Sequence, residues 1–175
     1  MKPLSLEIIE SYNNIRTVSD KSVICHAPFI NINFDQYGNM TACCYNRSEK
    51  FGTYPKDTII QAWNGEAIIK LRNSLLENSL EGGCSLCKEL IMGRNFTGSR
   101  AMAFDKYLHN SNKNISNLIN YPRIMEFELA NTCNLECSMC NGNFSSTIRK
   151  NRERKPPLLS PYDKEFLNQL NVSER

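Results

Sequence analysis

Eight cysteines, most of them in closely spaced groups, constrain the fold of this 175-residue chain more than any other feature. The late group has the spacing C-x3-C-x2-C within the stretch NTCNLECSMCNG, and a C-x2-C pair lies in EGGCSLCKEL near the middle of the chain. The other three precede that pair, and two of them are adjacent. In order, the cysteines are Cys25, Cys43, Cys44, Cys84, Cys87, Cys133, Cys137 and Cys140. The grouping predicts two separate thiol sites.

The compartment decides how these thiols are interpreted. No apolar run approaches the roughly 20 residues that span a bilayer, and the early acidic residues Glu7 and Glu10 are not typical of a secretory signal. We therefore expect a cytoplasmic protein, in which clustered cysteines serve metal binding or catalysis rather than structural disulfides. A net charge of +3 does not indicate a nucleic-acid or membrane partner.

A β-hairpin is predicted between the first cysteines. The stretch FININF alternates and places Ile30, Ile32 and Phe34 on one face of a strand, DQYGN supplies a turn with Gly38 at a positive φ, and MTACC forms the returning strand. The hairpin brings Cys25 near the vicinal pair. Because adjacent strand residues point to opposite faces, only one member of that pair faces a shared site.

Helical periodicity follows the hairpin. DTIIQAWNGEAIIKLRNSLLENS predicts two helices that break at Asn64 and Gly65, with Trp63 filling the core between hairpin and helix. Another helix follows Cys87, and Gly82 just before the C-x2-C pair allows a tight approach of the backbone. The region from there to about residue 120 is polar and is expected to be irregular. A capped helix is predicted in SPYDKEFLNQL.

The early cysteines are sufficient for a complete metal site. Four thiolates, from Cys25, one of the vicinal pair, Cys84 and Cys87, can close a tetrahedral zinc site or hold a four-cysteine iron–sulfur cluster. The spacing of these cysteines does not distinguish a zinc site from an iron–sulfur cluster.

The late cysteines form an incomplete set. They follow an expected strand, YPRIMEFELA, in which Met125, Phe127 and Leu129 alternate with glutamates. Structural zinc sites have four protein ligands, and no histidine lies nearby to complete this one. A cubane cluster held by three cysteines leaves one iron with an open position, so the gap can be read as a substrate site.

The stretch CNLECSMC resembles the signature of the radical S-adenosylmethionine (radical SAM) enzymes, whose partial (β/α)6 barrel begins with a strand before this motif. The resemblance implies a 4Fe-4S cluster on Cys133, Cys137 and Cys140. Its open iron chelates S-adenosylmethionine, and its reduction cleaves the cofactor to a 5′-deoxyadenosyl radical. Met139 corresponds to the position beside the adenine. A GGE motif, usual in this family at the second barrel strand, is absent.

The earlier half is similar to the SPASM and twitch auxiliary-cluster domains of such enzymes. The resemblance rests on Cys25, Gly38, Cys43, the helix AWNGEAIIKLR and the pair CSLC. It implies an auxiliary 4Fe-4S cluster on Cys25, Cys43, Cys84 and Cys87, with Cys44 as a bystander. Because KELIMGRNF adds no further cysteine, a one-cluster, twitch-like domain fits better than a two-cluster SPASM domain.

Together these features predict an α+β chain, in which a small twitch-like domain of a β-hairpin plus helices precedes the first β/α portion of a radical SAM barrel. The expected segments are an N-terminal arm over 1–22, the auxiliary-cluster domain over 23–112, a linker over 113–120 and the start of the radical SAM domain over 121–175. A βαβ unit takes about 30 residues or more, so residues 121–175 supply one strand and one or two helices. One parallel strand cannot make a barrel, and we therefore expect the N-terminal part of a longer enzyme.

The expected function is reductive cleavage of S-adenosylmethionine, with electrons from a reductant such as ferredoxin or flavodoxin and with a peptide or small molecule as substrate. The alternative is a nonenzymatic four-cysteine zinc or iron–sulfur module that binds metal or transfers electrons. In that alternative, Cys44 joins the late cysteines in a second structural site.

Overall fold

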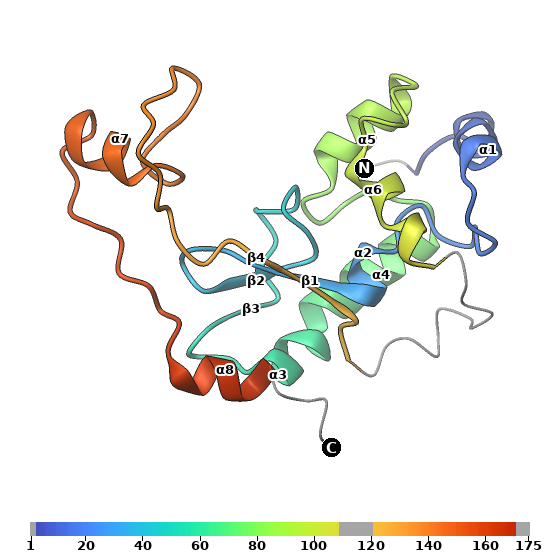
Figure 1. Ribbon diagram of the computed structural model, residues 1–175. Helices are drawn as coiled ribbons and strands as arrows, with labels where there is room; N and C mark the ends of the chain where they lie inside the picture. The colour runs from blue at the N-terminus through green and yellow to red at the C-terminus, as the bar shows by residue number, and fades with distance from the viewer. Residues whose placement is uncertain (1–2, 109–120, 171–175) are drawn as a thin grey trace.

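A four-stranded sheet organises the computed structural model, which describes residues 3–108 and 121–170 (Figure 1). The strand order is β3-β2-β1-β4. The strands are β1 (Asn31–Phe34), β2 (Asn39–Thr41), β3 (Gly52–Thr53) and β4 (Ile124–Phe127). The first three are antiparallel, whereas β4 pairs parallel to β1, with Asn31 opposite Ile124. One sheet therefore joins the hairpin to the strand that leads into the late cysteines.

The predicted hairpin is present, with shorter strands than the alternation suggested. Gly38 takes a φ of 84° in its turn, as predicted, and the Asp35 carboxylate accepts hydrogen bonds from the backbone N–H groups of Tyr37 and Asn39. Residues Ala27–Ile30 form the short helix α2 instead of strand, because Pro28 lies in its first turn, where proline favours a helix. The returning strand ends at Thr41, and a turn follows it, closed by the bond from Asn46 N–H to the Cys43 carbonyl at 3.0 Å.

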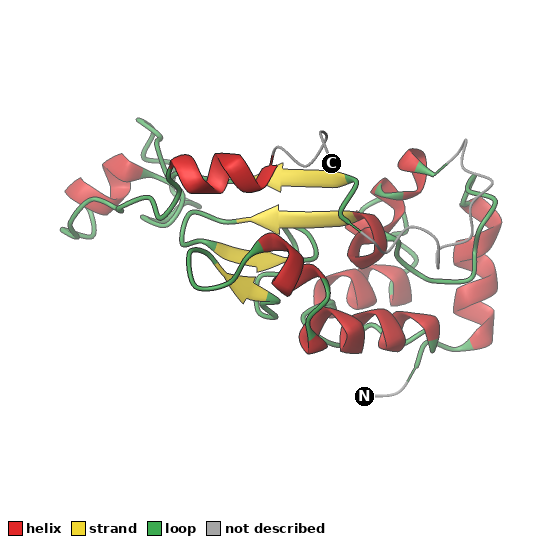
Figure 2. Cartoon of the chain, turned by 90° about the horizontal axis from the view of Figure 1, so that it is seen from below, coloured by secondary structure: helices red, strands yellow, loops and turns green. Residues whose placement is uncertain are grey.

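Most of the helices lie at one end of the sheet, and α7 lies at the other (Figures 1 and 2). None of the described helices is long and apolar enough to cross a membrane. The helices are α1 (Leu6–Ile15), α3 (Ile59–Trp63), α4 (Glu66–Leu76), α5 (Ser85–Met92), α6 (Arg100–Ala103), the 3-10 helix η1 (Asp105–Tyr107), α7 (Ser146–Asn151) and α8 (Lys164–Leu170).

The break between α3 and α4 falls at Asn64 and Gly65, as the sequence predicts. A capping box starts α3, in which Thr58 and Gln61 satisfy each other's backbone N–H groups. One expectation differs from the structure and another is not tested by it. Residues 100–107 are helical where an irregular segment was expected, because Ala101 and Phe104 turn into the core. The predicted linker over 113–120 lies outside the described residues.

Two apolar clusters stabilise the structure. The first packs α1, α2, α5 and α6 together and contains the three buried cysteines of the early group. The second covers one face of the sheet, where Trp63, Ile32 and Phe166 are almost completely buried. The prediction that Trp63 fills the core is confirmed. The early cysteines thus lie in the helical core at one end of the sheet, and the late cysteines follow β4 toward its other end.

Candidate metal centre

Four thiols of the early group line one pocket. Cys25 precedes α2, Cys43 follows β2, and Cys84 and Cys87 lie at the start of α5. Cys25, Cys43 and Cys87 are buried, whereas Cys84 is partly exposed at the mouth. The rest of the lining is mainly apolar and includes Ala42, Leu75, Leu80 and Ala101. The four cysteines that sequence reasoning selected for the auxiliary site are therefore brought together.

Local geometry explains this convergence. Cys84 is the N-cap residue of α5 and Cys87 lies three residues later, so both side chains lie on one face of the helix start. Gly83 precedes them with a φ of 82°, and a Cβ at this position would collide with the Asn46 side chain. Asn46 in turn donates a hydrogen bond from its side-chain amide to the Gly82 carbonyl at 2.7 Å. The turn after β2 is thereby fastened to the turn before α5.

Burial disfavours the thiolate form of three of the pocket cysteines, and the thiolate is the form that binds metal. Burial raises the pKa of Cys25 well above its usual value, with a further contribution from the neighbouring thiols, Cys43 first. It also raises the pKa of Cys43 and of Cys84 to about 12. Two donors already face the sulfur atoms: Ala27 N–H lies 3.4 Å from Cys25 Sγ, and the Asn46 amide lies 3.6 Å from Cys84 Sγ. Metal binding at this pocket therefore releases protons from the thiols.

The donor set of this pocket consists of four thiols. Around one zinc ion all four sulfur atoms converge to about 2.3 Å from the metal. Among residues 3–108 and 121–170, no three His, Cys, Asp or Glu side chains are arranged to hold a single ion. The four thiols line a small cavity of about 20 Å³. An all-sulfur donor set suits an iron–sulfur cluster, in which each thiolate binds a different iron, and it also suits a zinc ion.

The neighbouring Cys44 lies outside this pocket. It is partly exposed, and its pKa is raised by burial and by the carboxylates of Glu126 and Glu128, which the guanidinium groups of Arg100 and Arg47 partly offset. Arg47 pairs with Glu128 at 2.8 Å, and Arg100 pairs with Glu126. Of the vicinal pair, Cys43 therefore faces the pocket and Cys44 faces a charged surface.

The late cysteines lie on the loop between β4 and α7. Cys137 is exposed, whereas Cys133 and Cys140 are partly exposed. The Cys133 carbonyl accepts hydrogen bonds from the hydroxyls of Ser146 and Thr147, at 3.0 and 3.1 Å. These bonds, at the first turn of α7, anchor one end of the loop.

Further bonds close the rest of this loop. The Asn131 amide donates to the Gly142 carbonyl at 2.8 Å, and Gly142 N–H donates to the Glu153 carboxylate at 2.7 Å. Arg152 donates to the Cys137 carbonyl at 3.2 Å. Met139, the position implied to contact adenine, is 94% exposed and projects into solvent. The loop is anchored to α7 and leaves its thiols accessible.

The comparison with family models identifies the early group. Residues 25–88 match the SPASM iron–sulfur cluster-binding domain. The match begins at Cys25, ends one residue after Cys87 and includes all four pocket cysteines. The late cysteines lie outside it. No curated protein and no solved structure matches the chain.

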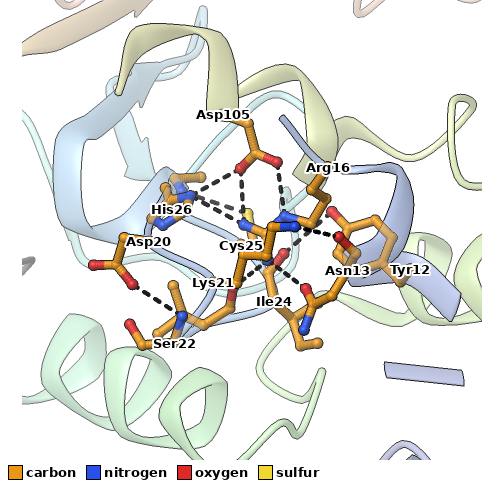
Figure 3. A network of polar contacts seen from close by, with 12 residues as sticks. Tyr12, Asn13, Arg16, Asp20, Lys21, Ser22, Ile24, Cys25, His26 and Asp105 are labelled. Atoms are coloured by element: carbon orange, nitrogen blue, oxygen red, sulfur yellow. Dashed lines mark hydrogen bonds and ion pairs between the residues drawn. The ribbon is translucent and has the colours of Figure 1, made fainter. Parts of the chain in front are cut away.

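Two polar residues beside the pocket, Arg16 and Asp105, were missed by sequence reasoning, whereas His26 is a candidate outer donor because it follows Cys25. Arg16, His26 and Asp105 are almost completely buried and form a network next to Cys25 (Figure 3). Arg16 belongs to the predicted N-terminal arm over 1–22, to which the sequence assigns no chemistry. No local signal marks Arg16, because it lies in the mostly polar stretch NNIRTVSD.

Proposed function

We propose that this protein binds an iron–sulfur cluster through Cys25, Cys43, Cys84 and Cys87. The observation that carries the proposal is the convergence of these four thiols on one pocket within the segment that matches the SPASM domain. Their elements come from distant parts of the chain, so a bound cluster also ties the hairpin to α5. The mainly apolar lining limits the access of water to the three buried cysteines, and the Ala27 N–H and the Asn46 amide donate toward Cys25 and Cys84.

The proposal extends to the late cysteines and to catalysis. Cys133, Cys137 and Cys140 hold a second cluster with one iron left for S-adenosylmethionine, as in the radical SAM enzymes that the motif resembles. When bound, that cluster supplies the electron that cleaves the cofactor. The accessible loop supports this assignment, because a cluster that takes both a cofactor and an electron from a reductant must be reachable. The chain's own contribution is to anchor the loop on α7 and to present Met139 beside it.

The rest of the proposal concerns partners and compartment. A ferredoxin or flavodoxin supplies the electrons, and a peptide or small molecule is the substrate. A reducing cytoplasm suits the eight free thiols. Within this scheme the early cluster serves as the auxiliary cluster.

Metal analysis of anaerobically purified protein tests the proposal. We expect a brown protein with about four irons and four sulfides for each bound 4Fe-4S cluster. The combined variant C25A/C84A removes the early cluster, and C133A/C137A/C140A removes only the late one. A colourless protein with stoichiometric zinc would contradict the iron assignment.

Cofactor turnover tests the enzymatic part separately. With dithionite, the full-length protein that includes the rest of the expected barrel should convert S-adenosylmethionine to 5′-deoxyadenosine and methionine, and C133A/C137A/C140A is expected to abolish this conversion. If the brown protein yields no 5′-deoxyadenosine, and its reduced late cluster gives the same electron paramagnetic resonance spectrum with and without S-adenosylmethionine, the radical SAM assignment fails while cluster binding stands.

A further inference from the structure

A buried ion pair lies close to Cys25, and neither of its members lines the pocket. Arg16, at the C-terminal end of α1, donates from Nε and Nη2 to the two carboxylate oxygens of Asp105, at 2.7 and 2.8 Å. The Arg16 side chain is 0% exposed and that of Asp105 is 4% exposed. The two residues are 89 positions apart in the sequence. Such a two-point guanidinium–carboxylate contact fixes both distance and orientation.

The same guanidinium also holds the backbone that leads to Cys25. Arg16 Nη1 donates to the Val23 carbonyl at 2.8 Å. Tyr12, on the preceding turn of α1, donates its hydroxyl to the Ile24 carbonyl at 3.2 Å, and the Arg16 guanidinium lies 5.1 Å from the centre of the Tyr12 ring. The two residues before Cys25 are therefore both bound to α1.

The residue after Cys25 is held by the same carboxylate. His26 Nδ1 lies 2.9 Å from Asp105 Oδ1, and because a carboxylate only accepts, this ring nitrogen carries the proton and donates. Figure 3 shows Asp105, Arg16 and His26 meeting beside Cys25. The network thus contacts the chain on both sides of one pocket cysteine, although neither Arg16 nor Asp105 lines the pocket.

We propose that Arg16 and Asp105 are positioning residues for the cluster at the four-cysteine pocket: they fix the backbone around Cys25 so that its sulfur faces the pocket, and their opposite charges balance beside the bound cluster. This inference rests on the proposed cluster binding. Outer contacts that orient a ligand typically change metal affinity by about 10- to 100-fold when they are removed. A balanced pair also sets the local potential, since an added electron is stabilised by nearby positive charge and opposed by nearby negative charge.

The two residues predict different changes when they are substituted. Arg16→Lys keeps the positive charge and loses the two-point contact with the Asp105 carboxylate. A chelator is therefore expected to remove the early cluster about tenfold faster or more, with little change in the reduction potential of the cluster. Asp105→Asn keeps the shape of the side chain and leaves the guanidinium uncompensated. In this variant the reduction potential of the early cluster is therefore expected to shift upward. Tyr12→Phe removes one hydrogen bond and is expected to give a smaller loss of retention without a shift in potential.

The chain offers matched controls on the same helix. Glu7 of α1 pairs with Arg94, which follows α5, and their side chains are 79% and 52% exposed. Arg94→Lys and Glu7→Gln therefore repeat the replacement of an arginine by lysine and of a carboxylate by an amide. This exposed pair joins α1 to the end of α5 and makes none of the hydrogen bonds to residues 23–26 described above. Both controls are expected to retain the iron and the potential of the unchanged protein.

The experiment uses C133A/C137A/C140A as its background, so that only the early cluster is observed. Chelator-driven bleaching measures retention, and a mediated redox titration followed by electron paramagnetic resonance measures the potential. A background protein without iron would refute the cluster assignment itself. If that protein holds its cluster and Asp105→Asn has the potential of Glu7→Gln, the charge balance is refuted. If Arg16→Lys and Tyr12→Phe retain iron as well as Arg94→Lys does, the positioning role is refuted. This comparison does not need Asp105→Asn, so it also holds if that variant does not fold.

Discussion

At the scale of single residues, the choice between two adjacent cysteines decides the ligand set. Cys43 is buried and lines the pocket, whereas Cys44 is partly exposed beside Glu126 and Arg100. We therefore expect Cys43→Ser to lose the early cluster and Cys44→Ser to retain it. Iron and sulfide analysis of both variants in the C133A/C137A/C140A background measures this difference.

The two substitutions are matched in chemistry and neighbouring in sequence, so each controls for general effects of serine at this turn. Equal iron contents in the two variants would contradict the assignment of Cys43. A loss confined to Cys44→Ser would reverse it and would place the ligand on the charged side of the turn.

The sequence was informative about residues whose relation is local. The pair Cys84 and Cys87 is separated by less than one helical turn, and a hairpin necessarily returns Cys43 toward Cys25, so their convergence could be predicted. Arg16 and Asp105 could not be paired in this way, because 89 residues separate them and neither lies in a motif. Long-range ion pairs of this kind depend on how complete elements pack.

At the scale of elements, the turn before α5 depends on a conformation that favours glycine. Gly83 has a φ of 82° and is packed against the Asn46 side chain. Gly83→Ala is therefore expected to destabilise the protein by more than about 1 kcal/mol and to reduce its iron content. Denaturant unfolding of the anaerobic protein, together with iron analysis, measures both effects.

Gly93, which ends the same helix, provides the control. Its φ is −77°, which alanine adopts readily. Gly93→Ala is expected to change the free energy of unfolding by less than about 1 kcal/mol. If the two alanine variants are equally stable, the turn tolerates a side chain and our account of its geometry is wrong.

The helix α8 stabilises the other end of the molecule through one ring. Phe166 is 1% exposed and packs against Phe34 and Tyr54 with ring centroids 5.1 Å apart in each case. Phe166→Ala is expected to cost about 3–5 kcal/mol because it leaves a cavity against the sheet. Denaturant unfolding measures this cost, and Leu167→Ala, at a side chain that is 56% exposed, is expected to stay within about 0.5 kcal/mol. Similar losses in both variants would show that α8 is not anchored by Phe166.

Elements also show where prediction from sequence stops. The helices α3 and α4, their break and the hairpin follow from local periodicity and turn residues, and the structure confirms them. The short helices α2 and α6 were not predicted, because a single helical turn leaves too few residues for a period. The parallel pairing of β4 with β1 was not predicted either, since more than 80 residues separate these strands and no turn links their registers.

At the scale of the whole molecule, the two apolar clusters differ in their relation to the pocket cysteines and to the sheet. The cluster at the helical end contains Cys25, Cys43 and Cys87, three of the ligands of the proposed iron–sulfur cluster. The other cluster covers the sheet and contains no cysteine among its buried residues. Metal binding contributes free energy of folding to the part of a protein that supplies its ligands. Removal of iron should therefore loosen the first cluster more than the second.

The fluorescence of one buried tryptophan allows the effect of iron removal on the two apolar clusters to be compared. Trp63 is the chain's one tryptophan, is 0% exposed and belongs to the cluster on the sheet. When a chelator removes the iron, we expect amide hydrogen exchange to accelerate in α1, α5 and α6 while the emission of Trp63 keeps its wavelength. A red shift of that emission in step with iron loss would mean that both clusters unfold together. In that case the metal would stabilise the whole fold, and the sheet would not persist without it.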